Sequence, residues 1–269
     1  WDGEWYVRAY FDDGKPLGSK DNDECKIDLI AQSWSVLSGG GDLRRAIKAI
    51  AIADRYLVRP LEDVVLLLAP PFDKTALDPG YIKGYLPGLR ENGGQYTHAA
   101  VWLAMAHAML RDGDSAWRIL SIINPVKSGT SPKSIQRYGS EPYVLAGDVY
   151  FREPFVGRGG WSWYTGSAGW MYRTIVEWLL GIRKEGNMLK VDPVLPTSWS
   201  GFSLEYRHGT NNTLYEIRVE NANGGQGVSS LLLDGLEQPV NGFPLTDDGL
   251  VHTVQVRLDA NCPREKRKI

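Results

Sequence analysis

The chain has 269 residues and a formal net charge of −2, and 43% of its residues are hydrophobic. It can therefore bury a core, and it shows no basic footprint for nucleic acid. No apolar run reaches the roughly 18 residues that span a bilayer, so we expect a cytoplasmic protein without a membrane segment of its own. Cys25 and Cys262 lie far apart and without metal-ligand spacing, so both are expected to be unpaired and no metal site is predicted.

The first two thirds of the chain have apolar residues at helical spacing. This pattern runs through 27–37, three glycines interrupt it, and Asp42 is a good N-cap for a second helix that extends to Leu57. Further helices are predicted over 95–113, over 114–124, for a short stretch after Glu141, and over 165–182. The last helix is predicted to have one apolar face, made of Ala168, Met171, Tyr172, Ile175, Val176 and Leu179.

Long loops rich in glycine and proline, 59–95 and 124–142, separate these helices. Ordered loops of this length usually carry function. Paired helices with such loops at one end indicate a toroid of αα-hairpins over residues 1–185, and the predicted helices, about six in number, would form half of it.

Beyond residue 186 the apolar period changes to two, and turn sequences such as NANGG and TDDG separate the runs. The alternating apolar positions are Leu189, Val191, Leu204, Tyr206, Tyr215, Ile217, Val219, Leu231, Leu233, Val254, Val256 and Leu258. This pattern predicts a small antiparallel β-sandwich over 186–269, so the fold class of the chain is α+β. The basic tail PREKRKI is interpreted as a solvated end rather than a binding element.

Four stretches are too polar, aromatic and glycine-rich to be core. They are WDGEW at 1–5, GLRENGGQYTHAA at 88–100, EPYVLAGDVY at 141–150 and GRGGWSWYTGSAGW at 157–170. The chain also has ten Trp and 13 Tyr against six Phe. Aromatic side chains with a polar edge can stack on sugars and hydrogen-bond to them. Each could equally be a core residue, so this excess is a weak indication of a carbohydrate ligand.

Thr165 and Gly166 lie at the start of the last predicted helix. A helix N-terminus offers unpaired N–H donors, and glycine lets an anion approach them. The position is therefore either a phosphate site or a simple helix cap formed by Thr165. It is not a nucleotide-binding P-loop, because no Gly-Lys-Ser/Thr follows. His98 is either a hydrogen-bonded core residue or a donor to such a phosphate, whereas His107 is interpreted as structural.

Asp2 lies between two tryptophans. Aromatic burial is expected to raise the pKa of its carboxyl group, as a general acid requires. Inverting cleavage of a glycosidic bond by water needs such an acid together with a base. Attack by phosphate needs only the acid and an anion site, because phosphate is already anionic. Both reactions stay open, and Glu4, Glu91 and Glu141 are the carboxylates available as a base.

At these four stretches the chain resembles the inverting β-glycoside phosphorylases, which include cellobiose and chitobiose phosphorylases and the C-terminal domain of cyclic β-1,2-glucan synthases. The motifs WDGEWYVRAYFDDGKPLGS, NDE, IAQSW, RENGGQYTHAA, EPYV and WYTGSAGWMYR occur in this order and cover nearly the whole chain. The resemblance implies the second half of an (α/α)6 barrel followed by a C-terminal β-sandwich. The wording of WDGEWYVRAYFDDG is most similar to the glucan synthase branch, whose parent enzyme would be associated with the inner membrane.

The same resemblance implies a role for each candidate residue. The candidates are Asp2 as the general acid, His98, Thr165 and Gly166 for phosphate, and Trp1, Arg90, Glu91, Asp148 and Tyr164 for sugar. Arg90 replaces a Lys of the relatives at the donor sugar, and its planar fork differs from the point charge of Lys. Asp148 stands near a Gln that contacts sugar in the relatives.

The implied reaction is phosphorolysis of a β-linked glucan, with the β-1,2 linkage favoured, to α-glucose 1-phosphate. Its partners would be the oligosaccharide and inorganic phosphate as co-substrate, without a cofactor. The first half of the barrel, or a second copy of the chain, would complete the site. Two alternatives stay open, an inverting glycoside hydrolase and a non-catalytic glucan-binding fragment.

Overall fold

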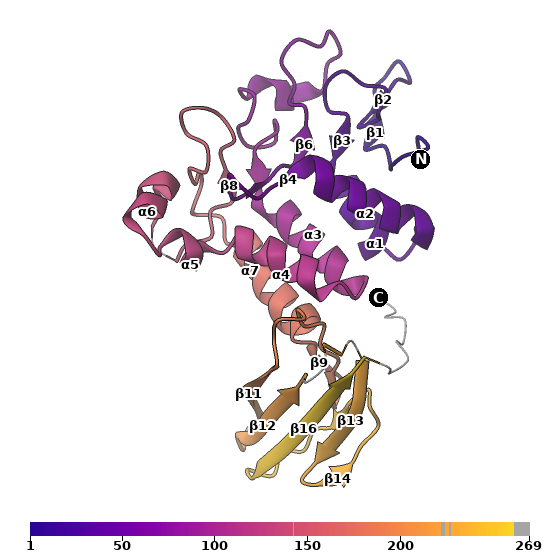
Figure 1. The fold of residues 1–269 in the computed structure, drawn as a ribbon, viewed down its shortest axis with the longest axis vertical. Coiled ribbons are helices and arrows are strands. Elements are labelled where there is room, and N and C mark those ends of the chain that lie inside the picture. The colour runs from indigo at the N-terminus through magenta and orange to yellow at the C-terminus, as the bar shows by residue number, and fades with distance from the viewer. Residues whose placement is uncertain (142, 222–223, 226, 261–269) are drawn as a thin grey trace. The chain divides into compact units, whose positions relative to one another are not determined.

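The computed structural model describes residues 1–141, 143–221, 224–225 and 227–260. Within these ranges the chain folds into two compact units (Figure 1). The helical unit comprises Trp1–Leu110 and Arg118–Tyr172, and the sandwich unit comprises Arg111–Trp117 and the described residues from Arg173 on. Cys25 is a buried free thiol, whereas Cys262 and the tail PREKRKI lie outside the described residues. None of the helices in the described ranges has both the length and the apolar content to cross a bilayer.

Most helices lie close to their predicted positions. They are α1 (Leu29–Leu37), α2 (Leu43–Leu57), α3 (Thr97–Met109), α4 (Gly113–Ile122), α5 (Pro125–Ser128), α6 (Pro132–Tyr138) and α7 (Gly166–Arg173), which continues as a π-helical segment, Thr174–Leu179. As predicted, Asp42 caps α2 by accepting a hydrogen bond from the Arg45 N–H. α1 packs against both α2 and α3, and the alanine-rich α3 is buried on nearly all sides. The half-toroid inferred from the sequence stays a prediction.

α1 begins two residues later than the apolar pattern predicts. Ile27–Asp28 instead form strand β3, which pairs antiparallel with β6 (Leu68–Ala69). The carboxylate of Asp28 then accepts the N–H groups of Ile30 and Ala31 and starts the helix. Ile27 has helical spacing in the sequence but lies outside the helix, because the N-cap residue Asp28 follows it.

The segment 124–142 is not the loop that the sequence predicts, because it contains α5 and α6. Each of these helices begins with a proline in its first turn, where the missing N–H loses no hydrogen bond. The short helix predicted after Glu141 is also wrong. The described residues beyond it instead lead to strand β8 (Asp148–Val149), which pairs with β7 (Gln95–Tyr96).

Short strand pairs brace the other long segments of the helical unit. They are β1 (Ala9–Tyr10) with β2 (Pro16–Leu17), and β4 (Val58–Arg59) with β5 (Val64–Val65). A single 3-10 turn, Gly80–Gly84, is the helical element of the predicted loop 59–95. Such pairs hold the loops in place without forming a large sheet.

The buried face of α7 differs from the predicted one. The buried residues of α7 and its π-helical extension are Ser167, Met171, Thr174, Trp178 and Leu179. Ala168 and Tyr172, which the prediction placed on the apolar face, are exposed. The prediction assigned the buried face by its apolar residues. In the structure the buried side also includes two small hydroxyl residues, Ser167 and Thr174.

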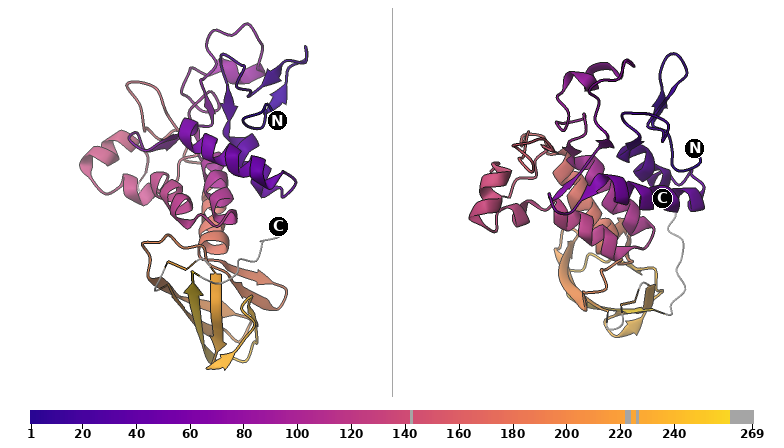
Figure 2. Two further views of the ribbon diagram at one scale, coloured as in Figure 1. Left: turned by 45° about the vertical axis from the view of Figure 1, so that its right-hand side comes forward. Right: turned by 45° about the horizontal axis from the view of Figure 1, so that its top comes forward.

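The sandwich unit has two sheets around one apolar core (Figures 1 and 2). The strands are β9 (Ile182–Glu185), β10 (Met188–Val191), β11 (Gly201–His208), β12 (Thr213–Glu220), β13 (Gly227–Leu233), β14 (Leu236–Glu237), β15 (Phe243–Pro244) and β16 (Val251–Asp259). One sheet has the order β11-β12-β16-β13-β14, and the other has the order β15-β10-β9.

The sandwich is not wholly antiparallel as predicted, because β12 and β16 pair in parallel, with Ile217 opposite Val254 and Val219 opposite Val256. The predicted apolar positions of these strands do face the core. An alternating pattern identifies which side chains face inward but carries no information about strand direction.

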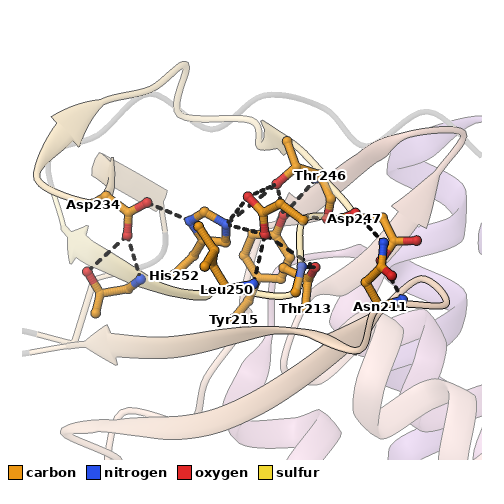
Figure 3. Close-up of polar contacts among 11 residues, drawn as sticks. Asn211, Thr213, Tyr215, Asp234, Thr246, Asp247, Leu250 and His252 are labelled. Carbon is orange, nitrogen blue, oxygen red and sulfur yellow. Dashed lines mark hydrogen bonds and ion pairs between the residues drawn. The ribbon is translucent and has the colours of Figure 1, made fainter.

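A network of polar groups closes one end of the sandwich (Figure 3). His252 stacks on the buried ring of Tyr215 at a centroid distance of 5.1 Å. Its Nδ1 lies 2.6 Å from Asp234 Oδ2, and its Nε2 lies 3.1 Å from Asp248 Oδ2. The hydrogen bond to Asp234 is the main reason why the pKa of His252 is raised. The network thus favours a charged imidazolium between two carboxylates.

Candidate functional site

The segment that carries Asp2 is fastened to the helical unit by two buried side chains. The Trp5 indole Nε1 donates to the carbonyl oxygens of Gly18, at 3.0 Å, and Lys26, at 2.9 Å. The fully buried amide of Gln32, on α1, accepts from Tyr6 N at 3.0 Å and donates to Tyr6 O at 2.9 Å. Both contacts hold the chain within a few residues of the candidate acid.

Four donors surround the carboxylate of Asp2. Its Oδ1 accepts the N–H groups of Glu4 and Trp5, both at 2.9 Å, and its Oδ2 accepts Lys20 N at 2.8 Å and Ser19 Oγ at 3.2 Å. Burial raises the pKa of Asp2, but these hydrogen bonds together outweigh it and bring the pKa below its usual range. The expectation that aromatic burial raises this pKa is therefore wrong. Backbone donors, which the sequence does not reveal, decide the outcome.

A pocket of about 520 Å³ brings together most of the other candidates. Its lining residues are Tyr96, His98, Gly147, Asp148, Trp161, Trp163, Tyr164, Thr165, Gly166, Ser167 and Trp170. The three predicted stretches 88–100, 141–150 and 157–170 all contribute to it, because β7 pairs with β8 and the N–H groups of Gly160 and Trp161 donate to Asp148 on β8. The pocket thus contains all three phosphate candidates and two of the sugar candidates.

His98, at the start of α3, lies between two aromatic rings. The ring centroids of Tyr96 and Trp102 are 4.6 and 4.7 Å from it, both edge-on. Burial lowers the pKa of His98, so its imidazole is neutral at neutral pH and has one N–H donor. His98 also borders a second pocket, of about 720 Å³, which Tyr6 lines. The segments that carry Asp2 and His98 therefore meet at one cavity.

Thr165 and Gly166 begin α7 with unused donors. The carbonyl of Thr165 accepts from Gly169 N at 3.0 Å, as at a helix N-terminus. Within the described residues the Thr165 hydroxyl has no hydrogen-bond partner, and the buried Ser167 Oγ has none either. A Cβ added to Gly166 would meet no atom within 4 Å, so the backbone is open to an approaching ligand.

The sugar candidates form a second set of buried polar atoms. Arg90 Cζ lies 3.3 Å from the ring centroid of Trp161. Arg90 Nη1, Glu91 Oε2 and Asp148 Oδ2 are buried without partners in the described structure. Asp148 is 2% exposed, and burial is the main reason why its pKa is raised. Buried polar atoms are rarely left unpaired, so these three groups point to a polar ligand.

The remaining candidates lie elsewhere. Trp1 lines neither pocket, and the side chains of Arg45 and Lys48 lie over its ring. His107 is buried in α3 with its Nε2 3.2 Å from Asp54 Oδ2, as a structural residue would be. Within the described ranges, no cluster of three or more His, Cys, Asp or Glu is arranged to hold a metal ion.

Sequence reasoning missed the residues that support the acid. Ser19 and Gln32 are both buried and contact Asp2 or its segment. Both occur in the motifs quoted for the family resemblance, GKPLGS and IAQSW, but neither residue type suggests a role without the fold.

Comparison with known proteins places the chain in a family. Residues 1–181 match the Glycosyl hydrolase 94 superfamily, catalytic domain. The chain is 50% identical over 232 residues to the cyclic beta-(1,2)-glucan synthase NdvB of Rhizobium meliloti, with 86% of this chain and 8% of that protein covered. It is 34% identical over 261 residues to the solabiose phosphorylase of Paenibacillus borealis, with 95% of this chain and 33% of that protein covered.

A 1,2-beta-oligoglucan phosphorylase of Listeria innocua is 27% identical over 255 residues, which is 88% of this chain and 23% of that protein. The chain thus spans a third or less of the length of these relatives. Among solved structures, the family GH92 alpha-mannosidase BT3965 of Bacteroides thetaiotaomicron aligns with a TM-score of 0.28 and 11% identity over 62% of this chain and 19% of that chain, a likeness too slight to bear on the fold. The match over residues 1–181 confirms the resemblance drawn from the motifs: the chain belongs to the Glycosyl hydrolase 94 superfamily.

Proposed function

We propose that the chain forms part of the active site of a glycoside phosphorylase that cleaves β-linked glucan with inversion. Phosphate would attack the anomeric carbon, Asp2 would protonate the departing oxygen, and α-glucose 1-phosphate would be released. The observation that carries this proposal is the single pocket in which His98, Thr165 and Gly166 lie beside Asp148 and Tyr164. An anion site and a polar sugar site that adjoin one another are what phosphate attack on a glycoside requires.

The proposed phosphate site uses donors that the fold leaves free. The neutral imidazole of His98 has one N–H, the Thr165 hydroxyl has a free O–H, and the first amides of α7 have no helical acceptor. Each hydrogen bond to a charged group contributes about 1.5–3 kcal/mol. Three such bonds would hold phosphate in place without a nearby lysine.

The proposed acid must be protonated before it acts. The four hydrogen bonds to Asp2 keep its carboxyl group ionised at neutral pH in the free chain. A bound phosphate anion and a sugar that displaces water would both favour the protonated form, since each penalises a second negative charge. We therefore propose that Asp2 takes up its proton when substrates bind.

The sugar would satisfy the buried polar atoms around Arg90, Glu91 and Asp148. Hydroxyl groups can donate to the two carboxylates and accept from the guanidinium. The Arg90 Cζ lies 3.3 Å from the ring centroid of Trp161, and this contact would restrict the directions of the guanidinium N–H groups toward the sugar.

The glucan synthase and oligoglucan phosphorylase relatives favour a β-1,2-linked substrate. Because the relatives are at least about three times as long as this chain, the proposed site would include residues from the rest of such a protein or from a second copy. The half-toroid over 1–185 and a sandwich over 186–269 are part of the same proposal.

An inverting hydrolase remains the second candidate, since a carboxylate could activate water. Of the possible bases, Glu4 is paired with Lys48 at 2.9 Å, and Glu141 accepts a hydrogen bond from Ser162. Glu91 keeps one buried oxygen without a partner among the described residues, so it is the base to test.

The two reactions differ in their need for phosphate. The chain is mixed with linear β-1,2-gluco-oligosaccharide, with and without inorganic phosphate, and glucose 1-phosphate and glucose are both measured. We expect glucose 1-phosphate only with phosphate, and its loss in Asp2→Asn. Free glucose in both tubes would favour a hydrolase, and binding without any product would favour a non-catalytic glucan-binding fragment.

A further inference from the structure

The mouth of the 520 Å³ pocket carries three exposed aromatic side chains on one loop. Trp161 is 41% exposed, Trp163 is 89% exposed and Tyr164 is 59% exposed, and all three line the pocket. We call Trp161, Trp163 and Tyr164 the aromatic rim. A tryptophan as exposed as Trp163 leaves most of its apolar surface in water, which is unfavourable unless a ligand covers it.

The loop under the aromatic rim is fixed by hydrogen bonds. Gly147 N donates to Trp161 O at 2.6 Å, and Trp161 N donates to Asp148 Oδ1 at 2.8 Å. Gly160 N donates to Asp148 O at 2.8 Å, and Ser162 Oγ donates to Glu141 at 3.2 Å. The backbone that carries these aromatic side chains is already ordered by hydrogen bonds. Binding of a ligand would therefore cost little free energy for ordering the loop.

The chemistry of the pocket favours a ligand with many hydroxyl groups beside the proposed phosphate. Among the described lining residues, Asp148 and the neutral His98 are the titratable side chains other than tyrosines. A purely apolar ligand would leave the buried Asp148 Oδ2 and Ser167 Oγ unpaired. A sugar chain suits both the aromatic rim and the buried polar atoms. Each sugar ring has an apolar face that can stack on an aromatic side chain and hydroxyl groups at its edge that can hydrogen-bond.

We infer that the aromatic rim binds sugar units beyond the bond that is cleaved, so that the chain recognises linear gluco-oligosaccharides of three or more units in preference to the disaccharide. This inference rests on the proposed function for the class of sugar. It adds that Trp163, to which the family resemblance gives no role, sets the preference for chain length.

The test measures binding separately from catalysis. Linear β-1,2-gluco-oligosaccharides of two, three, four and five units are titrated calorimetrically into the chain, into Trp163→Ala, and into Tyr10→Ala. Tyr10 is the matched control, because it is 65% exposed and lines neither of the two pockets described above. The exposure of Trp163 means that its removal leaves no cavity in the fold, and circular dichroism checks this.

We expect Kd to fall about tenfold from two to four units in the unaltered chain and in Tyr10→Ala. In Trp163→Ala all lengths should bind as weakly as the disaccharide. Equal Kd for all lengths in the unaltered chain, an unchanged length dependence in Trp163→Ala, or no binding at any length would each overturn the inference. A phosphorolysis assay on the same samples separates the two proposals. Length-dependent binding together with release of free glucose that does not require phosphate would reject the proposed function and leave the inference standing.

Discussion

Gln32→Leu is expected to destabilise the helical unit and release the segment that carries Asp2. The Gln32 amide is fully buried and makes three hydrogen bonds, two with the backbone of Tyr6 and one to Asp28 O. Leucine has a similar volume, so the loss comes from hydrogen bonds and not from a cavity. At 0.5–1.5 kcal/mol for each bond, the free energy of unfolding should fall by about 2–4 kcal/mol.

Urea unfolding followed by tryptophan fluorescence measures this loss. Of the ten tryptophans, only Trp117, Trp178 and Trp199 belong to the sandwich unit, so the signal reports mainly on the helical unit. With a slope of roughly 2 kcal/mol/M, the midpoint should fall by about 1–2 M urea. Gln136→Leu, at an exposed position on α6, is the control and should shift it by less than about 0.3 M. Equal midpoints for both variants would refute the view that Gln32 fastens this segment.

Three further predictions follow from other contacts. Ser19→Ala removes one of four hydrogen bonds to Asp2 and should move the pKa of Asp2 upward, which a carboxyl ¹³C NMR titration measures; an unchanged pKa would contradict the assigned contact. The raised pKa of His252 stabilises the sandwich unit below about pH 6.5, and this stability is lost as pH rises through the folded pKa. His252→Gln should therefore abolish the fall in thermal midpoint between pH 6 and 9, and a persistent fall would point to another group. In Gly160→Ala the new Cβ would lie 2.3–2.5 Å from the carboxyl group of Asp148 and would displace it. Oligosaccharide binding, measured calorimetrically, should be lost, whereas Gly169→Ala, where a Cβ meets nothing within 4 Å, should bind normally.

The helices and the inward-facing strand positions could be predicted because side-chain periodicity records burial directly. Asp42 caps α2 as predicted, and Val254 and Val256 face the core of the sandwich unit. The parallel pairing of β12 with β16 could not be predicted, because both strand directions give the same alternation. α5 and α6 could not be predicted either, because a proline is typical both of a loop and of the first turn of a helix. The N-cap hydrogen bond that distinguishes the two is visible only in the structure.

The candidate site, too, could be predicted from the sequence only in part. Three of the four polar, glycine- and aromatic-rich stretches form the walls of the pocket, because segments of this mixed composition do not suit a core. The ionisation of Asp2 could not be inferred, since it depends on N–H groups from Lys20 and Glu4, which any sequence possesses. Likewise, the exposure of Trp163 and the burial of Trp5 follow from the fold and not from residue type.

The central claim is that inorganic phosphate binds at the start of α7 beside the sugar site. The most direct test is an NMR titration of the chain with phosphate in the presence of oligosaccharide, following the amides of Gly166 and Ser167. We expect saturable shifts at both amides, and a roughly tenfold weaker Kd in Thr165→Val, which loses a hydrogen bond to the anion. Unmoved amides at Gly166 and Ser167, or equal Kd in the variant, would contradict it.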